Sequence, residues 1–291
     1  MMVITGRTKV LAVIGHPIGH SLSPVMHNAA IEALGLDYVY VPFTVHPDQI
    51  AEAMSSFRVL NIAGINATIP HKEILIPYLD EISEIATLTG SVNTIVNRDG
   101  HLSGHSTDGE GFLRSAEDEL GSIAGCKVLV LGAGGASRAV CVALRQAGCD
   151  LVIVNRTFER ANLLAQMLLG FPSQGLVNVI TADSSELPQI TAACDLIVNT
   201  TSLGMTPHPE ATPLPAELIK PHHRVYDLIY SPLETRLISE ARAKGATAVS
   251  GLKMLVYQGA VAFELWTGIY PPTDIMHDAL MQAILSRVSG K

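Results

Sequence analysis

The sequence predicts an α/β protein with two domains, and three observations support this. Short apolar runs that end in glycine or polar residues alternate with helical patterns along most of the chain. One of these runs is followed by a glycine-rich turn and a helical pattern, with glycines at 132, 134 and 135. The chain has 291 residues, of which 48% are hydrophobic and 16% charged, and this composition suits one large or two modest folded domains.

The first third of the chain is predicted to form a mostly parallel sheet with helices on its faces. Its strands are expected at 9–15, 38–45, 62–68, 92–97 and 101–105, and its helices at 24–34, 47–57 and 71–85. Asp99 and Gly100 separate the last two strands and predict a two-residue hairpin turn. Because this part carries no glycine fingerprint, we do not expect it to bind a nucleotide.

An amphipathic helix at 107–120 is expected to lead into the second domain. The strands of that domain are predicted at 128–131, 151–154, 177–180, 195–199, 225–229 and 247–249. Two helices without strands of their own, 252–266 and 273–288, end the chain, and we expect them to fold back onto the first domain. The predicted domains are therefore 1–107 plus 253–291 and 108–252, with a cleft between them where a substrate would bind.

The glycine-rich segment has the features of a dinucleotide-binding βαβ unit. A buried strand at 128–131 is followed by the glycines, a helix at 136–147 and a second buried strand at 151–154. Glycine lets backbone N–H groups approach a pyrophosphate at the start of such a helix. Glycine-rich turns also occur without nucleotides, and Ser137 stands where a third glycine is usual. The order and lengths of the elements favour dinucleotide binding.

The end of the second strand of this unit distinguishes NADP from NAD. An acidic residue there would bind a ribose 2′-hydroxyl and repel a phosphate. This chain instead has Asn155, Arg156 and Thr157, with Arg160 one helical turn later. A guanidinium group together with a hydroxyl suits a 2′-phosphate, so the expected cofactor is NADP(H).

Composition excludes several other classes of function. A net charge of −8 does not favour a surface for nucleic acid or anionic membranes. The four cysteines show no C-x-x-C spacing and suit buried positions in a reducing compartment. The apolar run 10–14 is too short for a signal peptide or a membrane span, so we expect a cytoplasmic protein. The eleven histidines form no metal-binding motif, and no metal site is predicted.

Two serines near the N-terminus are candidates for binding a small carboxylate. Ser23 precedes Pro24 and is predicted to be the N-cap of the following helix, a role that explains Ser23 without a ligand. That role does not explain Ser21. Two hydroxyls ahead of a helix N-terminus form a suitable anion site, and both interpretations stay open.

A second group of polar residues could handle a proton. Asn66 and Thr68 share one face of a strand end, and Lys72 lies on the first turn of the next helix, where the helix dipole disfavours a cation. Lys72 could be an ordinary solvated lysine and Asp108 a helix cap. If they face each other, the pair could pass a proton to or from a carbinol oxygen. Asn93 could donate to a substrate hydroxyl or cap a turn.

The ordered set of motifs along the chain resembles the shikimate dehydrogenase family. The motifs lie at 21–24, 66–72, 91–94, 106–109, 132–137, 155–157, 199–205, 226–230 and 251–258. No single motif is specific, but the set is, and it covers nearly the whole chain. One residue departs from the family pattern, because Ser106 stands where an asparagine is usual. We expect a rearranged hydrogen bond there and an intact active site.

The resemblance implies NADPH-dependent, reversible reduction of 3-dehydroshikimate to shikimate, on the route to chorismate and the aromatic amino acids. It implies a substrate domain and a Rossmann-type NADP domain, and Lys72 and Asp108 as the catalytic pair. It implies a substrate site of Ser21, Ser23, Asn66, Thr68, Lys72, Asn93, Asp108, Tyr230 and Gln258. The implied cofactor site contains Gly132, Ala133, Gly134, Gly135, Ala136, Ser137, Asn155, Arg156, Thr157, Arg160, Thr200, Ser202, Met205, Leu228, Gly251 and Met254. The expected assembly is a monomer or a homodimer.

Two alternative functions remain open at this point. The first is a quinate/shikimate dehydrogenase that uses NAD. Asn155 and Arg156 argue against NAD, and Ser23 stands where quinate-preferring relatives carry threonine. The second is a regulator that senses NADP(H) without catalysis, but such a protein would not need Lys72, Asp108 and the serine pair together.

Overall fold

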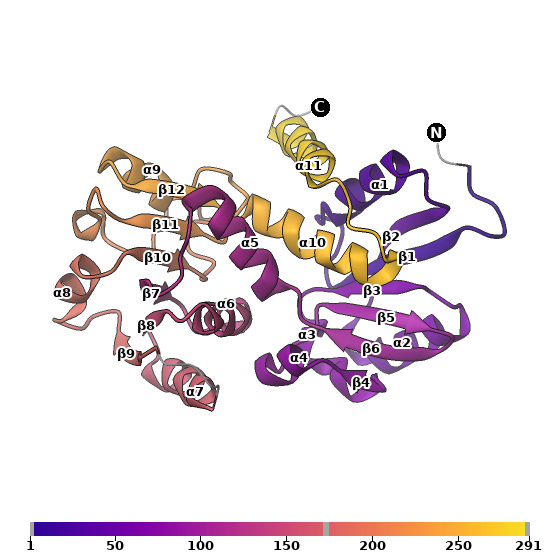
Figure 1. The fold of residues 1–291 in the computed structure, drawn as a ribbon, viewed down its shortest axis with the longest axis horizontal. Helices are drawn as coiled ribbons and strands as arrows, with labels where there is room; N and C mark the ends of the chain where they lie inside the picture. The colour runs from indigo at the N-terminus through magenta and orange to yellow at the C-terminus, as the bar shows by residue number, and fades with distance from the viewer. Residues whose placement is uncertain (1–2, 171–174, 289–291) are drawn as a thin grey trace. The chain divides into compact units, whose positions relative to one another are not determined.

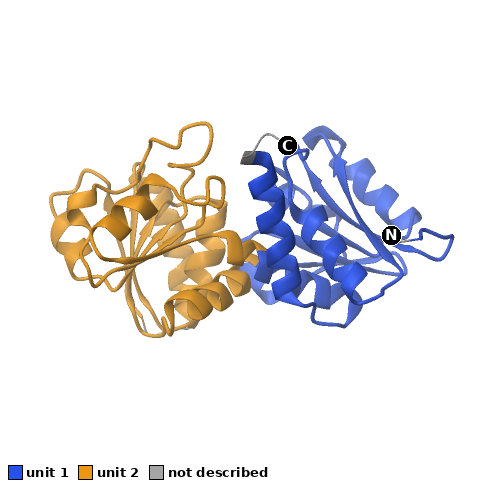
Figure 2. Ribbon diagram, turned by 90° about the horizontal axis from the view of Figure 1, so that it is seen from above, with its two compact units in different colours: residues 1–107, 256–291 blue, residues 108–255 orange. Residues whose placement is uncertain are grey.

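The computed structural model describes residues 3–170 and 175–288 (Figure 1). The chain forms two compact units, which are coloured separately in Figure 2. Unit 1 comprises the chain up to Thr107 and from Val256 onward, and unit 2 comprises Asp108–Leu255. Each unit has one six-stranded sheet, and the C-terminal helices belong to unit 1 from Val256 onward. The predicted α/β fold class is confirmed.

Unit 1 contains a mixed sheet with the strand order β2-β1-β3-β5-β6-β4. Its strands are β1 (Lys9–Gly15), β2 (Tyr38–Thr44), β3 (Gly64–Ala67), β4 (Glu81–Ile82), β5 (Thr94–Arg98) and β6 (His101–His105). β1 pairs in parallel with β2 and β3, and β4 pairs in parallel with β6. β5 is antiparallel to both β3 and β6. Asp99 and Gly100 join β5 to β6 with φ values of 53° and 90°, the left-handed conformation that a two-residue hairpin requires.

Helices cover both faces of this sheet. They are α1 (Ser23–Ala33), α2 (Ile50–Val59), α3 (His71–Ile74), α4 (Glu84–Thr89), α10 (Leu252–Thr267) and α11 (Thr273–Val288). Along β1 the buried residues alternate between the faces. Ala12 and Ile14 pack with Met54 and Phe57 of α2, since all four belong to one core cluster. On the other face, α1 packs against α11.

The helix predicted at 71–85 is wrong. The structure divides this segment into α3, a 3₁₀ turn at Ile76–Tyr78, the short strand β4 and the start of α4. Pro77 lies inside the segment and cannot donate a helical hydrogen bond. Glu81 and Ile82 instead pair with Ser103 and Gly104 of β6.

Tertiary hydrogen bonds hold this segment in its broken form. The Arg58 guanidinium donates to the Tyr78 carbonyl over 2.9 Å and to the Asp80 carboxylate over 2.6 Å. Asp80 also accepts the N–H of Leu102 over 2.7 Å. These partners come from α2 and β6, so no local sequence pattern could reveal them.

Unit 2 contains a fully parallel sheet with the order β12-β11-β10-β7-β8-β9. Its strands are β7 (Lys127–Leu131), β8 (Asp150–Asn155), β9 (Val177–Thr181), β10 (Leu196–Asn199), β11 (Arg224–Asp227) and β12 (Thr247–Ser250). Its helices are α5 (Asp108–Leu120), α6 (Gly135–Gln146), α7 (Phe158–Leu169), α8 (Leu187–Ala192) and α9 (Arg236–Ala243). Strands β8 and β9 are added on one side of β7, and β10, β11 and β12 on its other side. This reversal of strand order between β7 and β10 is the arrangement of a Rossmann fold.

Among the residues that the structure describes, no helix combines the length and the hydropathy that a membrane span needs.

Candidate active site

The polar residues predicted for the substrate site of unit 1 lie around one edge of its sheet. Ile14 of β1 pairs with Ala67 of β3, so the loops that carry Ser21 and Lys72 leave the sheet on the same side. β5 is antiparallel to β3, with Asn66 opposite Thr94, which brings Asn93 to the same edge. The parallel and antiparallel pairing together gather segments that are far apart in the chain.

Backbone hydrogen bonds tie these loops to one another. The N–H of Thr68 donates to the Ile14 carbonyl over 3.0 Å, and the N–H of Ala67 donates to the Asn93 carbonyl over 2.9 Å. The Lys72 carbonyl accepts the N–H of Val92 over 2.8 Å. The backbone that carries Lys72 is therefore anchored to the segment just before β5.

Asn93 bridges three segments of unit 1. Its Oδ1 accepts the N–H of Thr107 over 2.8 Å, and its Nδ2 donates to the Thr107 hydroxyl over 2.9 Å. The same Nδ2 donates to Oε1 of Gln258 on α10 over 3.3 Å. Asn93 thus anchors Thr107, which follows β6, and also Gln258, which is another residue of the predicted substrate site.

The N-cap role predicted for Ser23 is wrong. Ser23 is the first residue of α1, its N-cap is Leu22, and no side-chain cap bond is formed there. The N–H of Ser23 donates to the Ser21 hydroxyl over 3.3 Å. Pro24 occupies the second helical position, so the helix begins one residue earlier than the sequence pattern indicated. The hydroxyl that binds a backbone amide of the helix is that of Ser21.

In unit 2, the glycine turn lies at the point where the strand order reverses. Gly132 follows β7 with a φ of 107°, and a Cβ there would meet the Thr200 hydroxyl at 2.8 Å, so only glycine suits this position. Thr200 follows the neighbouring strand β10 and donates to the Leu131 carbonyl over 2.8 Å. Ser137 donates to the Gly132 carbonyl over 2.8 Å and braces the turn from within α6. Ligands of such sheets bind at this reversal point, outside the carboxyl ends of the strands.

The remaining segments predicted for the cofactor site also follow carboxyl ends of strands. Asn155 ends β8, and its amide donates to the Thr157 carbonyl over 2.8 Å. Arg156, Thr157 and Arg160 are exposed. Thr200, Ser202 and Met205 follow β10, Leu228 follows β11, and Gly251 and Met254 follow β12. The topology gathers all these segments at one edge of unit 2.

A buried carboxylate supports the loops after β10 and β11. Asp227 accepts hydrogen bonds from the Thr235 hydroxyl over 2.6 Å, the Asn199 amide over 2.9 Å and the N–H of Ile229 over 3.1 Å. Burial raises the pKa of Asp227 to about 6, although these three donors oppose the shift. Asn199 in turn accepts from the N–H and the hydroxyl of Thr201. Asp227 lies within the 226–230 motif, but an aspartate at a strand end has no pattern that would predict its buried supporting role from the sequence.

The predicted catalytic pair is divided between the units. Lys72 lies on α3 of unit 1, and Asp108 is the first residue of unit 2 and of α5. Of the other predicted substrate residues, Ser21, Ser23, Asn66, Thr68, Asn93 and Gln258 lie in unit 1, and Tyr230 lies in unit 2. The rearranged hydrogen bond expected at Ser106 is not present, because its buried hydroxyl has no hydrogen-bond partner among the described residues.

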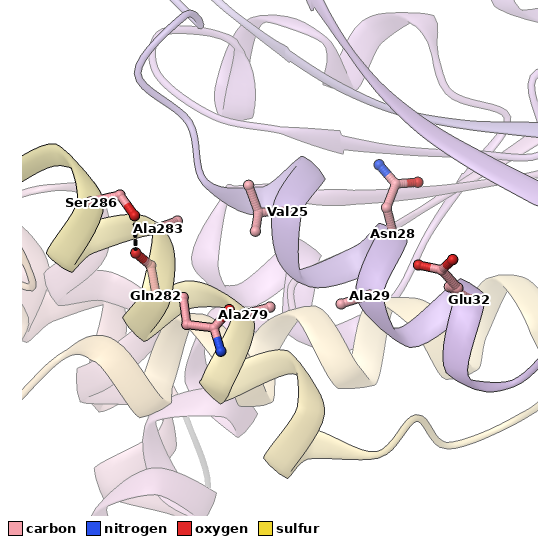
Figure 3. Close-up of a pocket in the computed structure, with 8 residues that line it drawn as sticks. All are labelled: Val25, Asn28, Ala29, Glu32, Ala279, Gln282, Ala283 and Ser286. Carbon is pink, nitrogen blue, oxygen red and sulfur yellow. Dashed lines mark hydrogen bonds between the residues drawn. The ribbon is translucent and has the colours of Figure 1, made fainter. Parts of the chain in front are cut away.

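A depression in unit 1 lies away from these residues. It has a volume of about 570 Å³ and lies between α1 and α11, lined by Val25, Asn28, Ala29, Glu32, Ala279, Gln282, Ala283 and Ser286 (Figure 3). None of the predicted site residues lines it. Within the described ranges 3–170 and 175–288, no group of three or more His, Cys, Asp or Glu side chains could hold a metal ion.

The fully parallel sheet of unit 2, with a glycine turn at its reversal point, is the fold of a dinucleotide-dependent oxidoreductase. Three family models match the chain. They are the shikimate dehydrogenase substrate binding domain at 13–95, shikimate/quinate 5-dehydrogenase at 114–207 and the shikimate 5'-dehydrogenase C-terminal domain at 251–281. The chain belongs to the shikimate dehydrogenase family, which confirms the resemblance noted from its motifs.

Relatives match over nearly the full length of the chain. The shikimate dehydrogenase (NADP(+)) of Moorella thermoacetica is 48% identical over 100% of this chain and 98% of its own length. A crystal structure of a shikimate dehydrogenase in complex with NADP⁺ has a TM-score of 0.92 at 41% identity, covering 97% of this chain and 98% of that one. The Thermus thermophilus enzyme in complex with NADP(H) and shikimate has a TM-score of 0.86 at 39% identity, covering 94% and 99%.

A relative with another specificity is also similar in structure. The quinate dehydrogenase of Corynebacterium glutamicum in complex with NAD has a TM-score of 0.88 at 33% identity. It covers 94% of this chain and 99% of its own. The fold alone therefore does not separate shikimate from quinate, and the residues of the site must be considered.

Proposed function

We propose that the chain catalyses the reversible, NADP-dependent interconversion of 3-dehydroshikimate and shikimate, running toward shikimate in the pathway to chorismate and the aromatic amino acids. The observation that carries the proposal is the gathering of hydroxyl and amide side chains with Lys72 around one sheet edge of unit 1. A small monoanion with several hydroxyls requires this set of neutral polar contacts and one proton-transfer group.

The cofactor is NADP(H), as relatives of this chain are NADP(+) enzymes. The residues present suit it. The backbone of 132–137 is available to a pyrophosphate at the start of α6, and the exposed Arg156 and Arg160 suit a 2′-phosphate. When bound, NADPH supplies a hydride to the carbonyl carbon of the substrate.

The protein side chains supply binding and the proton. Ser21 and Ser23 bind the substrate carboxylate, and Asn66, Thr68, Asn93, Tyr230 and Gln258 contact its hydroxyls. In the direction of reduction, the Lys72 ammonium donates a proton to the carbonyl oxygen, and in the reverse direction its amine takes the proton back. Asp108 orients Lys72 or shares the proton with it. One hydride and one proton together convert the ketone to the alcohol.

A cytoplasmic location is part of the proposal. Its support is that all four cysteines are buried thiols without disulfide bonds, as expected in a reducing compartment. Burial raises the pKa of Cys141 to about 12 and those of Cys149 and Cys194 to about 11, so these thiols stay protonated and unreactive.

Steady-state kinetics with shikimate and quinate, each with NADP⁺ and NAD⁺, test the proposal. The expected result is that kcat/KM is largest for shikimate with NADP⁺. A larger kcat/KM for quinate with NAD⁺ would favour the quinate-type alternative. No turnover of either substrate by a folded protein that binds NADPH would indicate a sensor and contradict the proposal.

A further inference from the structure

Tyr40 is buried in unit 1 and hydrogen-bonds one residue of the predicted substrate site. It belongs to β2, is 1% exposed, and donates from its hydroxyl to Oδ1 of Asn66 over 2.7 Å. This hydrogen bond therefore joins β2 to the end of β3.

The Tyr40 side chain has little freedom to move. Its ring stacks on His27 with centroids 4.3 Å apart and an interplanar angle of 13°, and Trp266 lies 6.0 Å away at a tilt. Its backbone is held as well, because Asn28 accepts the Tyr40 N–H over 2.9 Å and donates to its carbonyl over 2.8 Å. Burial raises the pKa of Tyr40 well above its ordinary value, so the phenol remains a neutral donor.

The partners of Asn66 determine which way its amide faces. Nδ2 donates to the Asn93 carbonyl and to the Thr94 hydroxyl, each over 3.1 Å, which uses both of its hydrogens. Oδ1 accepts from Tyr40. The opposite orientation would place Oδ1 against a carbonyl oxygen. The amide therefore has one acceptor lone pair left for a ligand and no donor.

We propose that Tyr40 is a positioning residue of the substrate site: its hydroxyl holds the Asn66 side chain in one orientation and leaves Asn66 as an acceptor for a substrate hydroxyl. This inference rests on the proposed function, which places Asn66 against shikimate. Tyr40 itself is buried against His27 and Trp266 and acts through Asn66.

Tyr40→Phe tests the inference, because it keeps the stacked ring and removes only the hydroxyl. We expect the KM for shikimate to rise about tenfold, as for the loss of one well-formed hydrogen bond, while kcat falls less than about threefold. The KM for NADP⁺ should stay within about twofold, because the residues that Tyr40 contacts all belong to unit 1. Fluorescence of Trp266, the only tryptophan, shows whether unit 1 remains folded.

Tyr226→Phe is the matched control. Tyr226 is also a fully buried tyrosine, and its hydroxyl lies 2.6 Å from that of Ser115 in unit 2. Removing this hydroxyl costs a similar buried hydrogen bond, but the KM for shikimate should change less than twofold. A KM for shikimate that rises equally in both variants would reduce Tyr40 to a merely structural role and overturn the inference.

Two further measurements distinguish this inference from the proposed function. In a double-mutant cycle, Tyr40→Phe should raise the KM for shikimate by less than about twofold when it is added to Asn66→Ala. Full additivity of the two changes would overturn the inference.

The side-chain amide NMR signals of Asn66 should shift in Tyr40→Phe and not in Tyr226→Phe. An unmoved signal would overturn the inference, and this measurement does not require turnover. If the wild type does not turn over shikimate, the proposed function fails. The NMR signals of the Asn66 side-chain amide then still test whether the Tyr40–Asn66 hydrogen bond is present.

A measurement on the wild type covers the case in which Tyr40→Phe does not fold. A tyrosine hydroxyl in a buried hydrogen bond of this length exchanges slowly enough to be observed by NMR. The Tyr40 hydroxyl proton should show proximity to the Asn66 side chain and shift when shikimate binds. A hydroxyl proton that is insensitive to saturating shikimate would overturn the inference.

Discussion

Trp266 covers Gly64 so closely that its indole ring occupies the space a side chain would need at that strand position. The indole Nε1 donates to the Ile95 carbonyl on β5 over 2.9 Å, and Arg98 binds the carbonyls of Leu265 and Trp266 at the end of α10. The ring is therefore held in place and cannot move aside. This contact fixes α10 over the centre of the unit 1 sheet.

Gly64→Ala should destabilise unit 1 strongly. A methyl group on Gly64 would overlap the indole ring, and overpacking of this kind costs about 1–3 kcal/mol or more. The measurement is urea unfolding followed by Trp266 fluorescence, which reports on unit 1 alone. Gly6→Ala is the control, because a Cβ at Gly6 meets nothing within 4 Å. Equal midpoints for the two variants would contradict the role assigned to Gly64.

His27 should make the stability of unit 1 depend on pH. Burial lowers the pKa of His27 to about 3, and neither ring nitrogen has a hydrogen-bond partner among the described residues. The unfolded chain takes up the proton near pH 6.5, so this contribution to stability is complete above pH 6.5 and is lost as the pH falls toward 3. Between pH 7 and pH 5 the wild type should lose roughly 2 kcal/mol more than His27→Phe. Parallel pH profiles for the two proteins would show that His27 does not stay neutral.

Asp227 should make the stability of unit 2 depend on pH in the opposite direction, so that stability falls as the pH rises. Its pKa is about 6 in the folded state against 3.8 ordinarily, so the neutral form is favoured by folding. The stability that this provides is complete below pH 3.8 and is lost as the pH rises through 6. Asp227→Asn should therefore gain stability over the wild type by up to roughly 3 kcal/mol above pH 6, provided Thr235 turns to accept a hydrogen bond. Hydrogen exchange of β11 amides measures this, and a gain that does not vary with pH would refute the assignment.

Lys72→Ala should lower kcat by roughly 10²–10⁴-fold, which is the usual contribution of a positioned proton-transfer group. Shikimate oxidation with saturating NADP⁺ measures it. Lys9→Ala is the control, since Lys9 lies at the amino end of β1, opposite the edge where the site residues gather. A near-normal kcat for Lys72→Ala would remove Lys72 from the proposed mechanism.

Arg156→Ala should weaken NADPH binding and leave NADH binding nearly unchanged. Arg156 is exposed just after β8, and only NADPH carries a phosphate on the ribose 2′ position. Titration calorimetry with both nucleotides gives the two dissociation constants, with NADH as the internal control. Equal weakening of both would mean that Arg156 does not contact the 2′-phosphate.

The sequence by itself determined those features whose cause is local. Asp99 and Gly100 predicted the hairpin, because they tolerate the left-handed conformation that the turn needs. The apolar run before Gly132 predicted a buried parallel strand that ends in a glycine turn, because a strand buried on both faces has a continuous apolar sequence and Gly132 adopts a φ of 107° that favours glycine. The family could be named from ordered motifs for the same reason, since each motif is a short segment.

The tertiary structure alone decided which side chains meet. Tyr40 and Asn66 are 26 positions apart and come together because β2, β1 and β3 pair in one register. The break in the segment 71–85 likewise depended on a partner from another element, Arg58 of α2. A hydrogen bond needs its partner within about 3 Å, and strand pairing rather than proximity in the chain supplies that partner.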